Sequence, residues 1–91
     1  MSQEYKKAQQ VLLSLKQAEL AEAQAALPIL NGLAGLVKSP GGDQSLEIEE
    51  LRSSAFLAIC EVGKALHRGQ PTDQLWTKAF DATERWKSAS K

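Results

Sequence analysis

The residues of this chain that could carry acid–base or metal chemistry are few. Glu19 and Glu22 are three residues apart, which makes them neighbours on a helix surface and candidates for a paired-carboxylate site. Dimetal sites in helical bundles combine acids from several helices with Glu-x-x-His motifs, and the sequence contains no such motif. The pattern therefore favours acids that reach solvent and pair with Lys16 or with a cation of another helix.

Cys60 and His67 are the only cysteine and the only histidine. One of each cannot build a Cys/His zinc cage within one chain, and Cys60 has no partner for an internal disulfide. The two residues are not direct neighbours on their expected helix, and no motif places a nucleophile beside His67. The pair Gly41-Gly42 lacks the strand and the Lys-Ser/Thr pair of a phosphate-binding loop. We therefore expect no catalytic, cofactor-binding or metal-binding residues and no enzymatic activity.

The charge balance narrows the classes of partner. The 91 residues include eleven Lys plus Arg and eleven Asp plus Glu, so the formal net charge is zero. A neutral chain lacks the positive field on which nucleic-acid binding relies. No apolar run approaches the roughly 18 residues of a membrane span, and residues 1–10 are polar where a signal peptide has its apolar core. The sequence predicts a cytoplasmic protein that does not bind membranes.

The elements that would have to position these residues are helices. Alanine and leucine dominate the composition, and clusters of Pro and Gly divide the chain into long segments without apolar–polar alternation. We predict one all-α domain over residues 1–91, a small up-down helical bundle of three long helices. Residues 28–37 either continue the first helix past a kink at Pro28 or form a short extra helix. The predicted helices span residues 2–27, 28–37, 46–68 and 72–88.

Local signals set these boundaries. Pro28 lacks an N–H donor and disfavours helical geometry in the residue before it, so the first helix should end or kink there. Asp43 or Ser45 can cap the helix that follows, and three glutamates stand near its positive end. Gly69 suits the left-handed position just past the end of that helix.

Self-association is expected for two reasons. A domain of this size gains little stability from its core, and the chain has neither a disulfide nor a metal site to supplement it. The run 55–60 (AFLAIC) is apolar around nearly two turns. Leu57 in this run lies either against other helices or, with Leu46, in a contact with another chain. We predict a homodimer.

The length of the first predicted helix also favours self-association, because it is longer than either helix that could cover it. Tyr5, Ala8, Leu12 and Leu15 should stay partly exposed unless a second copy covers them. Four residues that fall seven apart form a partial heptad interrupted by Lys16: Leu13, Leu20, Leu27 and Ala34.

Two tryptophans lie in the last predicted helix. Trp76 is expected in the core, where large rings fill the space between helices. Trp86, flanked by Arg85 and Lys87, is either a core residue or an anchor for a partner.

These features predict a non-enzymatic protein–protein interaction module, such as an adaptor, a chaperone-like binder, an inhibitor or an assembly factor. It would present an apolar helix face or groove to a second copy and to a further protein. The predicted partner-binding residues are Tyr5, Leu12, Leu15, Leu57 and Trp86.

The alternative is a small DNA-binding regulator that uses residues 46–68 and 72–88 as a helix-turn-helix-like pair. Lys78 and Arg85 would then face the groove of the DNA. Asp73, Asp81 and Glu84 lie among them and cancel much of their attraction for phosphate. The interaction module is therefore the preferred hypothesis.

Overall fold

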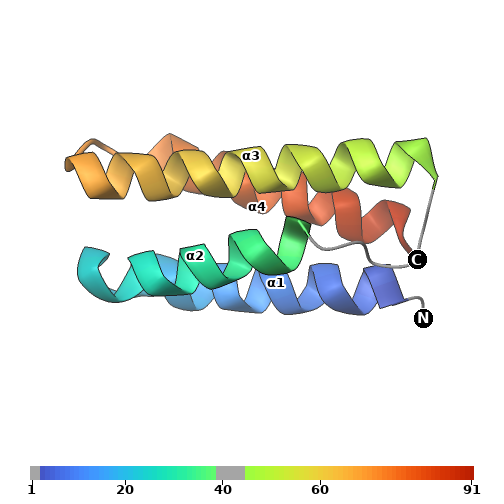
Figure 1. Cartoon of the computed structure of the whole chain (residues 1–91), viewed down its shortest axis with the longest axis horizontal. Helices are drawn as coiled ribbons and strands as arrows, with labels where there is room; N and C mark the ends of the chain where they lie inside the picture. Colours follow the sequence, from blue (N-terminus) through green and yellow to red (C-terminus); the bar gives the residue numbers. More distant parts are fainter. Residues whose placement is uncertain (1–2, 39–44) are drawn as a thin grey trace.

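The computed structural model describes residues 3–38 and 45–91. They form four α-helices, α1 (Gln3–Leu20), α2 (Ala23–Lys38), α3 (Leu46–Arg68) and α4 (Asp73–Ala89). The helices run alternately up and down along the long axis of a body of 36 × 18 × 17 Å, so α1 begins near the end of α4 (Figure 1). The prediction of an all-helical bundle is confirmed.

The helices form a four-cornered bundle. Successive helices pack against each other, and α4 closes the bundle by packing against α1. Residues 21–22 and 69–72 make short turns, which bring successive helices into antiparallel contact. Helix α1 therefore lies diagonally across from α3, and α2 lies across from α4.

The predicted bounds of the first two helices, 2–27 and 28–37, are wrong. Helix α1 ends at Leu20, and the turn at Ala21 and Glu22 separates it from α2, in which Pro28 is an internal residue. Pro28 cannot donate to the carbonyl of Gln24, but that carbonyl belongs to the first turn of α2, so only one bond near the helix start is lost. Burial of Ala26, Leu30, Leu33 and Val37 along the rest of α2 offsets this cost.

The corrected boundary removes the expected overhang of the first helix. Helix α1 has 18 residues and α2 has 16, so the two match in length. Ala8 and Leu15, which were expected to be partly exposed, are completely buried. The heptad that includes Leu13 stops at Leu20, because Leu27 and Ala34 belong to α2.

Helix α3 has the predicted bounds. The Ser45 hydroxyl accepts a hydrogen bond from the backbone N–H of Ile48 at 3.3 Å, and Gly69 follows the helix with a φ of 69°. The alternative cap, Asp43, lies outside the described residues. Each signal acts within one turn of the chain, which is why the sequence predicts both ends of this helix.

The core lies along the inner stripes of the four helices. Ile48, Ala55, Ile59 and Val62 of α3 are buried, as their spacing predicts. Trp76 is only 7% exposed, which confirms it as a core residue.

Candidate interaction surface

Helix α1 carries apolar residues on two opposite sides. Ala8, Val11, Leu15 and Ala18 are buried on the side that faces the core. Leu13 and Leu20 are 65% and 78% exposed. At 100° per residue, these two leucines lie about 180° from the centre of the buried stripe, and their spacing of seven places both on one line along the helix. We call Leu13 and Leu20 the outer leucine pair.

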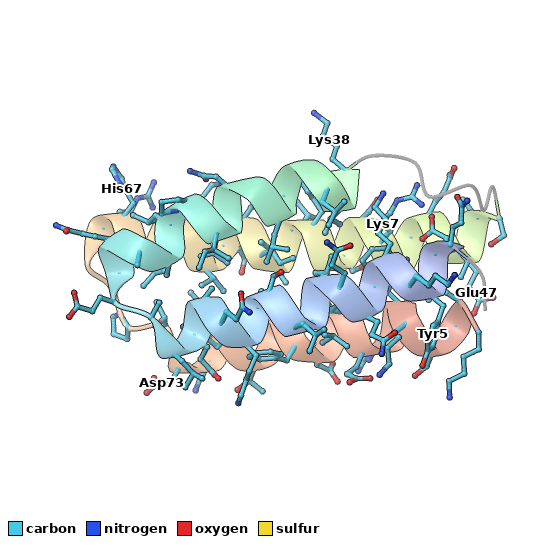
Figure 2. The ribbon with its side chains drawn as sticks, turned by 90° about the horizontal axis from the view of Figure 1, so that it is seen from below. Tyr5, Lys7, Lys38, Glu47, His67 and Asp73 are labelled. Atoms are coloured by element: carbon cyan, nitrogen blue, oxygen red, sulfur yellow. The ribbon has the colours of Figure 1, made fainter. Side chains whose placement is uncertain are left out.

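A groove between α1 and α4 adjoins the outer leucine pair. Figure 2 looks onto α1, which lies between α2 and α4. The groove has a volume of about 460 Å³, with Leu12 and Leu13 on the α1 side and Phe80 on the α4 side. Apolar side chains of two helices thus meet beside an exposed apolar line, which is the form of surface that receives an amphipathic helix.

Charged side chains line the rim of this groove in pairs. Lys16 Nζ lies 3.3 Å from Glu19 Oε1, and Lys87 Nζ lies 3.5 Å from Glu84 Oε2. The Lys16 ammonium also lies 5.8 Å from the centre of the Phe80 ring. Because each cation has an acid beside it, the rim carries no net charge.

The five predicted partner-binding residues do not share one surface. Leu12 is half-buried in the α1–α4 groove, and Tyr5 is half-buried near the start of α1. Leu57 is 61% exposed but belongs to α3, the helix diagonally across from α1. A partner that contacts Leu12 and Leu57 together would have to reach around the bundle.

Leu15 and Trp86 are completely buried. Leu15 lies on the inner stripe of α1, and Trp86 is fixed by a hydrogen bond inside the bundle. The structure therefore removes both from any surface that a partner can reach without opening the helices. The leucines that α1 exposes are Leu13 and Leu20 instead, and their heptad spacing was visible in the sequence.

Glu4, which sequence analysis missed, is a buried acid with a hydrogen-bond donor at each carboxylate oxygen. It is 1% exposed. Arg52 of α3 donates to Glu4 Oε1 at 2.8 Å, and the indole Nε1 of Trp86 in α4 donates to Oε2 at 2.7 Å. The Glu4–Arg52 pair spans the diagonal of the bundle, so one carboxylate joins α1, α3 and α4.

The periodicity of two helices could have revealed this network. Glu4 lies four residues before Ala8 and continues the buried stripe of α1. Arg52 lies between Ile48 and Ala55 on the buried stripe of α3. A buried charge requires a partner, so an acid and a base on two inward stripes predict a pair. Because donors occupy both oxygens of Glu4, the geometry is that of a structural anchor.

Lys7 lies close enough to this network for the charges of Glu4 and Arg52 to affect its pKa. Partial burial lowers the pKa of Lys7 below its ordinary value of 10.5, while Glu4 opposes the shift and Arg52 adds to it. In Figure 2, Lys7 and Tyr5 lie on opposite sides of the first turns of α1.

The candidate acids Glu19 and Glu22 lie in different elements. Glu19 belongs to α1 and pairs with Lys16, as expected, whereas Glu22 lies in the turn before α2. Among residues 3–38 and 45–91, no group of three or more His, Cys, Asp or Glu side chains is placed to hold a metal ion.

Cys60 and His67 line a second groove, between α2 and α3. Its volume is about 430 Å³, and Lys64 and Arg68 share its α3 wall. Cys60 is half-buried and His67 is exposed. His67 and Arg68 fall in the last turn of α3, where positive charge complements the helix dipole.

Helices α3 and α4 form an antiparallel hairpin within the bundle (Figure 1). In a helix-turn-helix, the two helices cross at roughly 90 to 120°. The observed pair runs along the common long axis, so its geometry does not favour the DNA-binding alternative.

No helix in the described part of the chain is long and apolar enough to cross a membrane.

No protein-family model, curated protein or solved structure matches this chain.

Proposed function

We propose that the chain is a non-enzymatic protein–protein interaction module that presents the outer leucine pair and the α1–α4 groove to a helix of its partner. The observation that carries this proposal is the exposure of Leu13 and Leu20, at 65% and 78%, on one line opposite the core. Neither leucine contributes to the core, so the fold gives no reason for both positions to be apolar.

The energetics of burial support such a contact. Full burial of a leucine side chain stabilises a complex by about 1.5 to 3 kcal/mol before the costs of association. An amphipathic helix with apolar residues at spacings of three, four and seven could cover both leucines and place another side chain over Phe80. The paired charges of Lys16 with Glu19 and of Lys87 with Glu84 fit a partner of low net charge.

The non-enzymatic part of the proposal is supported by the state of the buried acid. Glu4 accepts from both Arg52 and Trp86, so its oxygens are engaged in structural hydrogen bonds. We also propose that the module is cytoplasmic; the free thiol of Cys60 is compatible with a reducing compartment.

A photo-crosslinking experiment in the native host tests the proposed surface. Benzoylphenylalanine replaces Leu13 in one variant and Leu57 in another, a matched exposed leucine on the opposite corner of the bundle. We expect the residue-13 variant to form one discrete protein adduct, identified by mass spectrometry, and the residue-57 variant to form none. Equal adducts from both variants, or none from residue 13, would contradict the proposal.

A further inference from the structure

We propose that the groove between α2 and α3 is a separate binding site for a small anionic amphiphile, an apolar chain that ends in a carboxylate. This groove lies on the side of the bundle opposite the α1–α4 groove. The apolar chain enters between the two helices, and its carboxylate lies against Lys64 and Arg68 at the rim. The inference goes beyond the proposed protein contact and does not depend on it.

The α2–α3 groove reaches the core of the bundle. Its volume is about 430 Å³, and its lining includes Leu30 and Ile59, which are 2% and 0% exposed. The α1–α4 groove has a similar volume, but none of the described residues that line it is buried. Packed helices lie about 8 to 10 Å apart, and a helix with its side chains is about 10 to 12 Å wide. At the depth of Leu30, the space between α2 and α3 therefore admits a single chain and not a further helix.

The rim of the α2–α3 groove is positively charged. Lys64, His67 and Arg68 line its α3 wall, and their spacing makes them neighbours on the helix. In the described part of the chain, neither Lys64 nor Arg68 forms an ion pair with an acid. Glu61, the acid nearest to them in sequence, lies outside the groove lining. The α1–α4 rim differs, because each of its cations has an acid beside it. Two unpaired cations beside an apolar space favour an anionic occupant.

Gly63 leaves part of this groove open. It lies in the interior of α3 and lines the groove. A Cβ added to Gly63 would meet nothing within 4 Å outside the backbone around it, and Gly63 does not adopt a positive φ. Glycine inside a helix is less favourable than alanine, and neither packing nor backbone geometry requires it at this position. The missing side chain adds to the space available for a ligand.

The two parts of the ligand correspond to the two parts of the groove. Apolar side chains cover an alkyl chain, and the planar guanidinium of Arg68 can donate two parallel hydrogen bonds to one carboxylate. The α2 wall runs from Leu27 to Ala34, about 10.5 Å along the helix. An extended chain advances about 1.2 Å per bond, so octanoate, with about eight carbons in line, matches this length. In Figure 2, His67 projects outward at the end of the bundle where α2 begins, which places the charged rim next to solvent.

Titration of the full chain with octanoate, followed by two-dimensional amide NMR, tests the site. We expect saturable shifts in the amides of residues 27–34 and 59–68 and none at Leu13 or Leu20. Octanol has the same chain without the charge and should bind at least about tenfold more weakly. Acetate has the carboxylate without the chain and should cause no saturable shift.

Gly63→Leu should fill the groove without unfolding the bundle. The added Cβ has open space, and leucine favours helices more than glycine does. We expect octanoate affinity to fall at least about tenfold, with the helical circular dichroism unchanged. Gly32→Leu is the matched control, because Gly32 is also a helical glycine with space for a Cβ but lies outside the groove lining. This variant should bind octanoate like the wild type.

Removal of the two cations tests recognition of the carboxylate. Lys64→Gln combined with Arg68→Gln should weaken octanoate binding at least about tenfold and leave octanol binding unchanged. Lys78→Gln combined with Arg85→Gln is the control, because it removes the same two residue types from exposed positions of α4. The control should keep the wild-type affinity for octanoate.

Equal octanoate affinity in the groove variants and their controls would overturn the site, as would a titration without saturable shifts. Equal affinity for octanol and octanoate would overturn the role of the cations. Concentration-dependent shifts of the same amides without octanoate would assign the groove to a second copy and overturn the proposal. Capture of a protein by benzoylphenylalanine at residue 31, with no octanoate binding, would assign it to a protein partner instead. None of these outcomes alters the crosslinking expected at residue 13, so the proposed function is tested separately.

Discussion

Each side of α1 carries an exception to the usual distribution of polar and apolar residues. The inner side buries the charged residue Glu4, and the outer side exposes Leu13 and Leu20. The inner charge is stabilised because Arg52 and Trp86 donate to it inside the protein. Among residues 3–38 and 45–91, nothing covers the outer leucines in this way. The difference teaches that a buried charge requires a partner within the fold, whereas an exposed leucine is tolerated without one and can mark a contact surface.

The largest expected effect on stability comes from removal of the buried charge. Glu4→Leu leaves the partly buried Arg52 without its acid and the Trp86 indole N–H without its acceptor. We expect the free energy of unfolding to fall by about 3 to 5 kcal/mol, measured by urea denaturation.

Glu19→Leu is the control for this substitution, because Glu19 is an exposed glutamate on the same helix. Its effect should stay within about 0.5 kcal/mol of the wild type. If the two variants lose similar stability, the Glu4 network does not anchor the bundle.

The same substitution, leucine to alanine, compares the inner and outer sides of α1. Leu15→Ala opens a cavity in the core and should destabilise the fold by about 2 to 5 kcal/mol. Leu13→Ala should change stability by less than about 0.5 kcal/mol, because Leu13 is 65% exposed. The measurement is urea denaturation at a concentration low enough to keep the chain monomeric. A large loss for Leu13→Ala in the monomer would show that the outer leucines support the fold itself.

Trp86→Phe removes one hydrogen-bond donor of the inner side while keeping an aromatic ring. It removes the hydrogen bond of 2.7 Å to Glu4. Trp76→Phe makes the same change in ring size in the same helix without touching Glu4. We expect Trp86→Phe to cost about 1.5 to 3 kcal/mol more than Trp76→Phe in thermal or urea unfolding. Equal losses would mean that the indole N–H contributes nothing beyond its volume.

The smallest expected effect is a pH dependence from Lys7. Burial lowers its pKa below 10.5 in the folded chain, so the unfolded chain binds more protons between the lowered pKa and 10.5. Stability contributed by this group therefore rises as the pH increases through that window.

The measurement is the difference in unfolding free energy between the wild type and Lys7→Gln across a series of alkaline pH values. The difference should move in favour of the wild type as the pH rises, with Lys6→Gln as a control for the loss of one positive charge. A flat or falling difference would contradict the direction of the pKa shift.

Much of the fold follows from local signals in the sequence. The Ser45 cap and the left-handed Gly69 define both ends of α3. The helix break at Ala21 and Glu22 has no such signal, because Ala and Glu both favour helices. Pro28 carries the strongest local signal for a break, yet it lies inside α2. Packing of the apolar stripe of α2 against its neighbours outweighs that single preference.

The candidate surface was predictable only in part. The heptad spacing of Leu13 and Leu20 was visible in the sequence, but the direction in which they point depends on which stripe of α1 enters the core. Trp86 could not be assigned to the core or to the surface until its partner Glu4 was known.

The sequence by itself determined that the chain is helical, which residues form the apolar stripes and where α3 begins and ends, because propensities, caps and periodicity act over one or two turns. Only the tertiary structure decided where α1 stops, that Glu4 is buried and that two leucines of α1 remain outside. These outcomes depend on contacts between residues as far as 82 positions apart, and no local pattern encodes which helices will meet.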